Sequence, residues 1–248
     1  GAGQYTLQIT LRANETGSDR AAEIRIVCGE DEIVIVVRQK AQTKDNQSVV
    51  VFEDEAFRQF CVEHFDADRN GMVTDSEVSS VDSLSVPSME IVSLKGIEAF
   101  ASLRKLYCYD NKIEALDLSA NEELTVLGCH YNDLEELSLS ANTKLTSLNC
   151  NHNRISKLDL SALTELRELH VQYNELGELD LSGNPRLGIL QCMENWLTEL
   201  DITKCPDLTM LWADPMPTLE TLYWTQAQAD NMFALIFVPE STEKVVRE

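Results

Sequence analysis

A pair of leucines three residues apart recurs every 21 residues along the chain. The six pairs are Leu103/Leu106, Leu124/Leu127, Leu145/Leu148, Leu166/Leu169, Leu187/Leu190 and Leu208/Leu211. In five of the six units the same pattern follows, and in the first unit it consists of Cys108, Asn111, Ile113, Leu116 and Leu118. A strict period of this length is typical of a solenoid, in which one small unit stacks on copies of itself and buries its apolar side against its neighbours.

Within one unit, the spacing of apolar residues predicts two extended legs joined by turns. Leu106 and Cys108 alternate with outward positions, which is the period of a β-strand. The equivalent strand of the next unit should lie parallel to it, about 4.8 Å away. Asn111 marks the turn, where a buried amide can bond backbone groups that would otherwise stay unpaired. Leu116–Leu118 alternates again, so we expect an extended return leg and a mostly β stack.

The sixth unit departs from the pattern and predicts the end of the stack. Met216 stands where an asparagine is expected, with Pro215 and Pro217 on either side. An open end would expose the core of a solenoid, so terminal units must differ from the others. We expect residues 229–248 to form a capping pair of strands.

Four cysteines occupy one slot of the repeat. The residues in this slot are Cys108, Cys129, Cys150, Val171, Cys192 and Ala213. A slot shared by Cys, Val and Ala is a small buried apolar position, and the chain has no C-x-x-C pair. Reduced core thiols are therefore favoured over a disulfide or a metal role.

The net charge of −22 limits the partners of this chain. It disfavours nucleic acids and anionic membranes, whose phosphates would be repelled, and it suits partners that are cationic or neutral. No apolar run is long enough to span a membrane. We expect a secreted or outer-surface protein whose signal or lipoprotein leader, with a lipid anchor as one option, lies outside this sequence.

Residues 1–42 have the pattern of β-strands, predicted at 5–11, 24–27 and 33–37. The stretches 11–16 (Leu-Arg-Ala-Asn-Glu-Thr), 19–20 (Asp-Arg) and 36–40 (Val-Val-Arg-Gln-Lys) resemble the second half of a BACON domain. This resemblance implies part of an immunoglobulin-like sandwich, a module often found beside carbohydrate-active modules in gut bacteria. The segment 1–42 is therefore predicted to be a partial BACON-like β segment.

Residues 43–80 are predicted to contain a linker and then a helix-loop-helix with a calcium loop. Apolar residues between Phe52 and Phe65 share one helical face, and the helix should end at Asp66. The next twelve residues have the spacing of an EF-hand loop, with Gly71 at the sharp turn. Calcium prefers six to eight oxygen ligands. The predicted ligands are Asp66, Asp68, Asn70, Met72 through its carbonyl, Thr74 and Glu77. The alternative is a helix-capping turn that holds no ion.

Residues 81–228 are predicted to form the solenoid, beginning with a degenerate repeat at 81–102. The stretch Val92–Phe100 and the Leu-Asp-Leu-Ser motifs at 116–119, 158–161 and 179–182 resemble secreted bacterial leucine-rich-repeat proteins with short repeats. The resemblance extends from residue 53 to residue 228, and such proteins often carry a calcium-loop-like stretch before the repeats. We therefore expect a predominantly β leucine-rich-repeat solenoid, preceded by a small helical EF-hand-like segment and an N-terminal set of β-strands, and followed by a cap at 229–248.

Outward strand positions form the candidate ligand-binding face. Aromatic residues with polar tips suit recognition because they bury area and still offer hydrogen bonds. The candidate residues are Tyr107, Tyr109, His130, Tyr131, Asn149, Asn151, His152, His170, Gln172, Tyr173, Gln191, Met193 and Trp212. Two other interpretations are open: these residues simply tolerate solvent, or His130, His152 and His170 hold a metal.

The chain carries no nucleophile elbow, HExxH sequence or phosphate loop. We therefore expect a non-catalytic binding protein that recognises a protein or peptide. The alternative is a carbohydrate-binding accessory protein of a glycan-utilisation system, with sugar stacking on Tyr107, Tyr109, His130 and Trp212.

Overall fold

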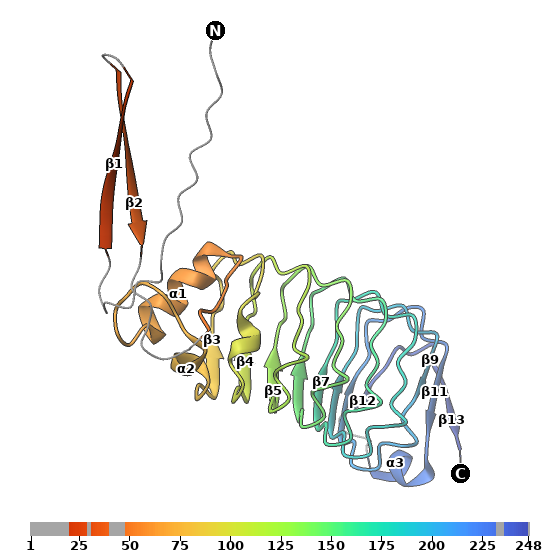
Figure 1. Ribbon diagram of the computed structural model, residues 1–248. Helices are drawn as coiled ribbons and strands as arrows, with labels where there is room; N and C mark the ends of the chain where they lie inside the picture. Colours follow the sequence, from red (N-terminus) through yellow and green to blue (C-terminus); the bar gives the residue numbers. More distant parts are fainter. Residues whose placement is uncertain (1–19, 29–30, 40–47, 232–235, 248) are drawn as a thin grey trace. The chain divides into compact units, whose positions relative to one another are not determined.

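The computed structural model describes residues 20–28, 31–39, 48–231 and 236–247, and the chain divides into two compact units, residues 1–48 and 49–248. The first unit contains a hairpin of β1 (Arg20–Cys28) and β2 (Asp31–Gln39), paired antiparallel along their whole length (Figure 1). Both strands include segments that the sequence predicts as strands. The third predicted strand, 5–11, lies outside the described residues, and the BACON-like assignment stays a prediction.

The first helix of the second unit is α1 (Glu55–Phe65), and its C-cap residue is Asp66, where the sequence predicts the end of the helix. Asp54 caps this helix, because its Oδ1 accepts a hydrogen bond from the Phe57 N–H at 2.9 Å. Its Oδ2 accepts another from the Val92 N–H at 2.9 Å. One buried carboxylate thus links the helix to the first turn of the solenoid.

The helix α2 (Asp75–Val78) leads from the loop after α1 towards the stack, and the 3-10 helix η1 (Ile97–Ala99) lies between the first two strands of the solenoid. Gly96, just before η1, has a φ of 106°. A Cβ at Gly96 would lie 2.7 Å from Cδ1 of Phe52. Only glycine satisfies both the left-handed backbone and this close contact.

The solenoid wall is an eight-stranded parallel sheet in the order β12-β10-β8-β7-β6-β5-β4-β3 (Figure 1). Its strands are β3 (Ser83–Ser85), β4 (Lys105–Tyr107), β5 (Val126–Gly128), β6 (Ser147–Asn149), β7 (Glu168–His170), β8 (Ile189–Gln191), β10 (Met210–Trp212) and β12 (Ile236–Phe237). The central leucines of β4 to β8 and β10 pair in register, each 21 residues after the last. The predicted β solenoid is confirmed.

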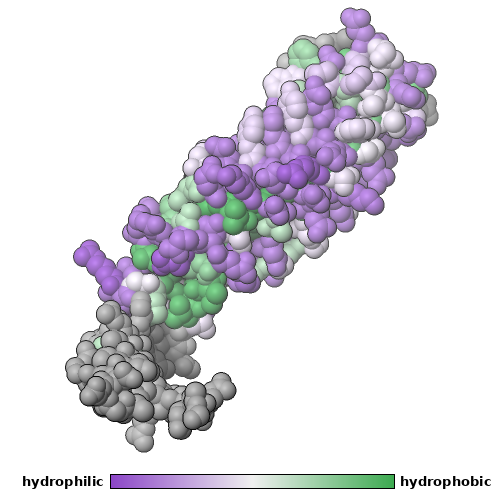
Figure 2. Space-filling model, turned by 90° about the horizontal axis from the view of Figure 1, so that it is seen from above, coloured by the Kyte–Doolittle hydropathy of each residue, from purple (hydrophilic) through white to green (hydrophobic). Residues whose placement is uncertain are grey.

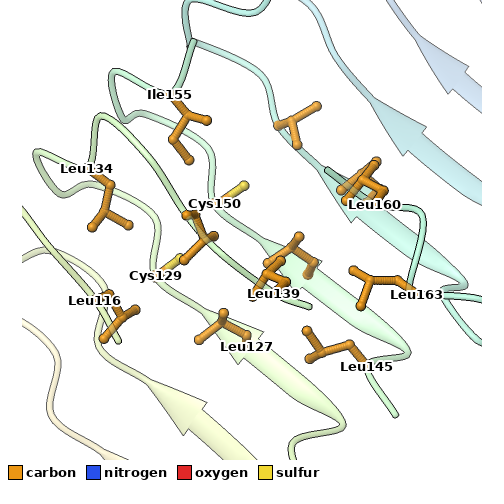
Figure 3. Packing of buried hydrophobic residues seen from close by; sticks show 14 of the residues in the cluster. Leu116, Leu127, Cys129, Leu134, Leu139, Leu145, Cys150, Ile155, Leu160 and Leu163 are labelled. Atoms are coloured by element: carbon orange, nitrogen blue, oxygen red, sulfur yellow. The ribbon is translucent and has the colours of Figure 1, made fainter. Parts of the chain in front are cut away.

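The core is a continuous column of leucines and small residues along the inside of the stack, part of which is shown in Figure 3. The cysteine slot is buried throughout, and the six cysteines whose side chains are described are free thiols. Burial raises the pKa of Cys108, Cys150 and Cys192 to about 12. These thiols stay protonated and inert at neutral pH, as the shared slot with Val171 and Ala213 indicates.

The repeated asparagines form a buried ladder at the turn after each strand. Its members are Asn111, Asn132, Asn153, Asn174 and Asn195. Asn153 illustrates the pattern: its Nδ2 donates to the carbonyls of Cys129 at 3.1 Å and Cys150 at 3.0 Å, and its Oδ1 accepts from the Leu134 N–H at 3.0 Å. Each amide therefore ties its own turn to the preceding unit.

A second ladder, which the sequence analysis missed, lies at the opposite turn. Asn121, Asn142 and Asn184 are fully buried, and the Nδ2 of each donates to two backbone carbonyls of the preceding turn. Leu163 occupies the same slot between Asn142 and Asn184, so the slot is not invariant. Gln228 continues the ladder, because its Nε2 donates to the carbonyls of Ile202 and Cys205.

The return legs form a second, three-stranded parallel sheet near the C-terminal end, made of β9 (Glu199–Asp201), β11 (Thr221–Trp224) and β13 (Glu243–Val246). The sequence predicts that residues 229–248 form a pair of strands, but the two strands in this segment do not pair with each other. The segment begins inside α3 (Gln226–Asn231), β12 pairs with β10, and β13 pairs with β11. Each of the two sheets has its own open edge, so each takes one of the last strands.

Candidate functional site

The predicted calcium loop lies between α1 and α2. Its carboxylates converge, because oxygens of Asp66, Asp68 and Glu77 all lie within 4.8 Å of one another. This is the only such group of acidic, histidine or cysteine side chains among the described residues. Three of the six predicted ligands are thus brought together.

The backbone wraps around these carboxylates. Oδ1 and Oδ2 of Asp66 accept from the N–H groups of Asn70 at 3.0 Å and Gly71 at 2.7 Å. Glu77 accepts from the N–H groups of Ala67 and Thr74, both at 2.9 Å. Gly71 has a φ of 79°, as a tight turn at this position requires. The candidate metal ligands are all oxygen atoms, which fits a hard cation such as calcium.

The loop is also joined to the segment before α1. Val73 is buried, and its carbonyl accepts from the Val50 N–H at 2.8 Å. Val49 and Thr74 form an antiparallel bridge beside this bond. The loop is therefore tied to the segment before α1 at its hydrophobic position as well as through its helices.

The candidate binding face is continuous along the sheet. Strand pairing places its middle column in register, and the residues in that column are Tyr107, Gly128, Asn149, His170, Gln191 and Trp212. Most predicted face residues are half-buried, while Asn151 is buried. Tyr131 and Tyr173 are the most open, with exposed fractions of 50% and 43%.

Aromatic rings of this face stack along the solenoid. The rings of Tyr109 and His130 are parallel, with centroids 4.5 Å apart. The ring of His152 lies between those of Tyr131 and Tyr173, at centroid distances of 4.1 Å and 4.2 Å. The predicted face residues from successive units thus form an aromatic ladder rather than isolated side chains.

The backbone under this ladder is left-handed. Tyr131, His152 and Tyr173 have φ values of 53°, 50° and 56°, and each directly precedes an asparagine of the first ladder. Such a conformation costs about 1 kcal/mol or more for a bulky residue, so the surrounding turn must impose it. The sequence analysis did not predict this left-handed backbone, although the position before each asparagine of the first ladder recurs every 21 residues in the sequence.

The three histidines do not form a metal site. Among the described residues their ring nitrogens do not come together as a ligand group. Burial lowers the pKa of His130, and the nearby His152 and His170 lower it further, while Asp110 opposes the change. Burial also lowers the pKa of His152. Both rings are therefore neutral at pH 7, which suits their stacking.

Two exposed aromatic residues were missed by the sequence analysis. Trp196 is 65% exposed and directly follows Asn195, the last member of the first asparagine ladder. Phe237 lies on β12 next to Trp212, with ring centroids 6.1 Å apart. Elsewhere in the solenoid the visible surface is mainly hydrophilic, with separate hydrophobic patches (Figure 2). None of the helices in the described part of the chain is long and apolar enough to cross a membrane.

Three solved structures with the same fold are bacterial proteins. An internalin (InlF) from Listeria monocytogenes is 23% identical over 80% of this chain and 65% of its own, with a TM-score of 0.62. Internalin C2 from the same species is 21% identical over 80% of this chain and 99% of its own, with a TM-score of 0.63. A leucine-rich-repeat protein from Leptospira interrogans is 20% identical over 68% of this chain and 50% of its own, with a TM-score of 0.54.

No protein-family model matches the chain, and no curated protein matches it in sequence. The chain spans about two thirds of InlF and half of the Leptospira protein. At these identities the likeness concerns the fold. The second unit is a leucine-rich-repeat β-solenoid like those of the bacterial internalins.

Proposed function

We propose that this chain is a non-catalytic binding protein that recognises a protein or peptide through the outward face of β4 to β8 and β10. The observation that carries the proposal is the contrast between the two sides of these strands. The inward leucine is the same in every unit, whereas the outward residue in register changes from Tyr107 to Asn149 to Trp212. A constant core with a variable face is how a solenoid scaffold presents a recognition surface.

The aromatic ladder favours a peptide over a sugar. A sugar ring would need an exposed aromatic face, but the faces of Tyr109 and His130 lie against each other, and His152 lies between two tyrosines. Tyr131 and Tyr173 are exposed, and a tyrosine hydroxyl can hydrogen-bond to a polypeptide.

Changes on the strand face should weaken binding without loss of stability. A peptide selected from a displayed library on the wild-type protein provides the probe for titration. Tyr107→Ala, His170→Ala and Trp212→Ala should each weaken its binding by about thirtyfold, because a central aromatic or polar anchor typically contributes about 2 kcal/mol. The melting temperature should change little, because these side chains are only half-buried.

Glu114→Ala is the control, because Glu114 is exposed on the return leg. It should leave both affinity and melting temperature unchanged. If Glu114→Ala abolishes binding while the three strand variants bind normally, the binding face is on the other side of the solenoid.

We further propose that the loop Asp66–Glu77 binds calcium. The supporting observation is the convergence of three carboxylates from Asp66, Asp68 and Glu77. Asn70, Thr74 and the carbonyl of Met72 would complete the ligand set. A bound calcium ion would neutralise the repulsion among the carboxylates. Because Val73 in the loop is bonded to Val50, the ion would also hold the loop against the segment that precedes α1.

Calcium should raise the melting temperature of the protein by several degrees. Single extracellular calcium modules bind with Kd values of about 10⁻⁴–10⁻³ M, so 10 mM calcium should add about 1–3 kcal/mol of stability over chelator. Asp66→Ala should abolish the rise. Asp75→Ala is the matched control, because Asp75 is exposed and outside the carboxylate group, and it should retain the rise. Identical melting curves in calcium and chelator would contradict the proposal.

The calcium loop also supports a secreted or cell-surface location. A single calcium loop of this class suits millimolar calcium, which is found outside cells rather than inside them. Surface labelling and fractionation of the producing bacterium, followed by detection with an antibody, would test this. Recovery of the protein only with cytoplasmic markers would contradict it.

A further inference from the structure

A groove lies on the return legs of the solenoid, away from the strand face. It has a volume of about 700 Å³, and its lining comes from three consecutive units and the C-terminal cap. Leu158 and Leu179 supply apolar lining, and Gly177 and Thr198 also line the groove. A Cβ added to Gly177 would meet no atom within 4 Å. We call this feature the return-leg groove.

The walls of the return-leg groove are strongly acidic. Five carboxylates line it, from Asp159, Glu178, Asp180, Glu199 and Asp201. The only cations of the lining are Lys157 and Arg247. Arg247 is ion-paired with Asp201 at 2.9 Å and lies over the ring of Tyr223, so it is already engaged. Lys157 alone therefore faces the other four carboxylates.

Part of this charge is fixed by the repeat itself. Asp159 and Asp180 occupy the same position of successive Leu-Asp-Leu-Ser motifs, and each accepts a hydrogen bond from the N–H of the serine two residues later. These bonds lower the pKa of Asp159 and of Asp180, so both carboxylates are ionised at neutral pH. Glu178 and Glu199 are exposed, and no hydrogen bond to their side chains is present among the described contacts.

We propose that the return-leg groove docks a lysine- or arginine-rich segment of a partner protein. Charge complementarity selects this occupant: the long basic side chains can place their aliphatic stems on Leu158 and Leu179 and their charged ends against the walls. The net charge of −22 would also speed the approach of such a segment. This surface is separate from the proposed strand face, so each can be tested without the other.

Fluorescently labelled octalysine is the probe, titrated in chelator at moderate salt with octaglutamate as the negative control. The double variant Glu178→Gln/Glu199→Gln should weaken octalysine binding roughly tenfold, because it removes two wall charges. Gly177→Gln should weaken it similarly by filling the groove without any change of charge. Neither variant should shift the melting temperature, since the altered positions are exposed.

Matched controls separate docking from general attraction to an acidic protein. Glu114→Gln/Glu175→Gln removes the same charge outside the groove, and Ser156→Gln adds the same side chain one unit before Gly177. Both should bind octalysine within twofold of wild type. The proposal is overturned if the wild type does not bind, if the control pair weakens binding as much as the wall pair, or if Gly177→Gln binds like wild type.

Discussion

Replacing Asn153 by leucine should lower the free energy of unfolding by about 3 kcal/mol or more. The change removes the amide that donates to the carbonyls of Cys129 and Cys150 and accepts from the N–H of Leu134. The buried Leu134 N–H would lose its acceptor, which costs about 1–3 kcal/mol. The carbonyls of Cys129 and Cys150 would each lose one of two donors and keep the other, the Nδ2 of Asn132 and of Asn174 respectively, so each lost bond adds about 0.5–1.5 kcal/mol. Chemical denaturation followed by circular dichroism would measure the loss.

Asn184→Leu provides the matched control, because it makes the same substitution in the second ladder. Leucine already occupies this slot at Leu163. The carbonyls that receive the Asn184 amide, those of Leu160 and Leu163, also accept bonds from backbone N–H groups. The cost should therefore be about 1 kcal/mol. Equal losses for the two variants would show that the first ladder is not the stronger one.

Leu148→Ala should lower the free energy of unfolding by about 3 kcal/mol, within the usual range of 2–5 kcal/mol for a buried leucine. Leu148 is fully buried on β6, and it pairs in register with Leu127 and Leu169. A cavity at this point weakens the contact with both neighbouring units, on which a solenoid depends. Denaturant unfolding curves would give this loss from the shift in midpoint, provided that the dependence of the free energy on denaturant concentration is unchanged.

Cys150→Ala is the comparison, two residues later on the same inward side. Ala213 occupies the equivalent slot and is equally buried. The loss should be about 1 kcal/mol, because only one heavy atom is removed from a slot that accepts small residues. A loss for Cys150→Ala as large as that for Leu148→Ala would mean that the cysteine column contributes more than its size indicates.

The C-terminal end shows where local sequence patterns are insufficient. Residues after the sixth unit have two apolar stretches, which the sequence alone predicts as a pair of strands. The structure instead places β12 beside β10 and β13 beside β11, with α3 before them. Which edges are open is a property of the assembled stack, so the partner of each strand could not be found from its own residues.

Periodicity by itself determined the solenoid, its register, the buried cysteine slot and the first asparagine ladder, because each repeats at one fixed spacing and must meet the same contacts in every unit. The spacing of Asp66 to Glu77 likewise predicted a loop whose carboxylates converge. Tertiary structure alone decided three other features: the stacking of His152 between Tyr131 and Tyr173, the left-handed turns beneath those rings, and the acidic walls around Leu158 and Leu179. These features depend on how side chains of different units approach one another across the stack, and a pattern read along one unit contains no information about that distance.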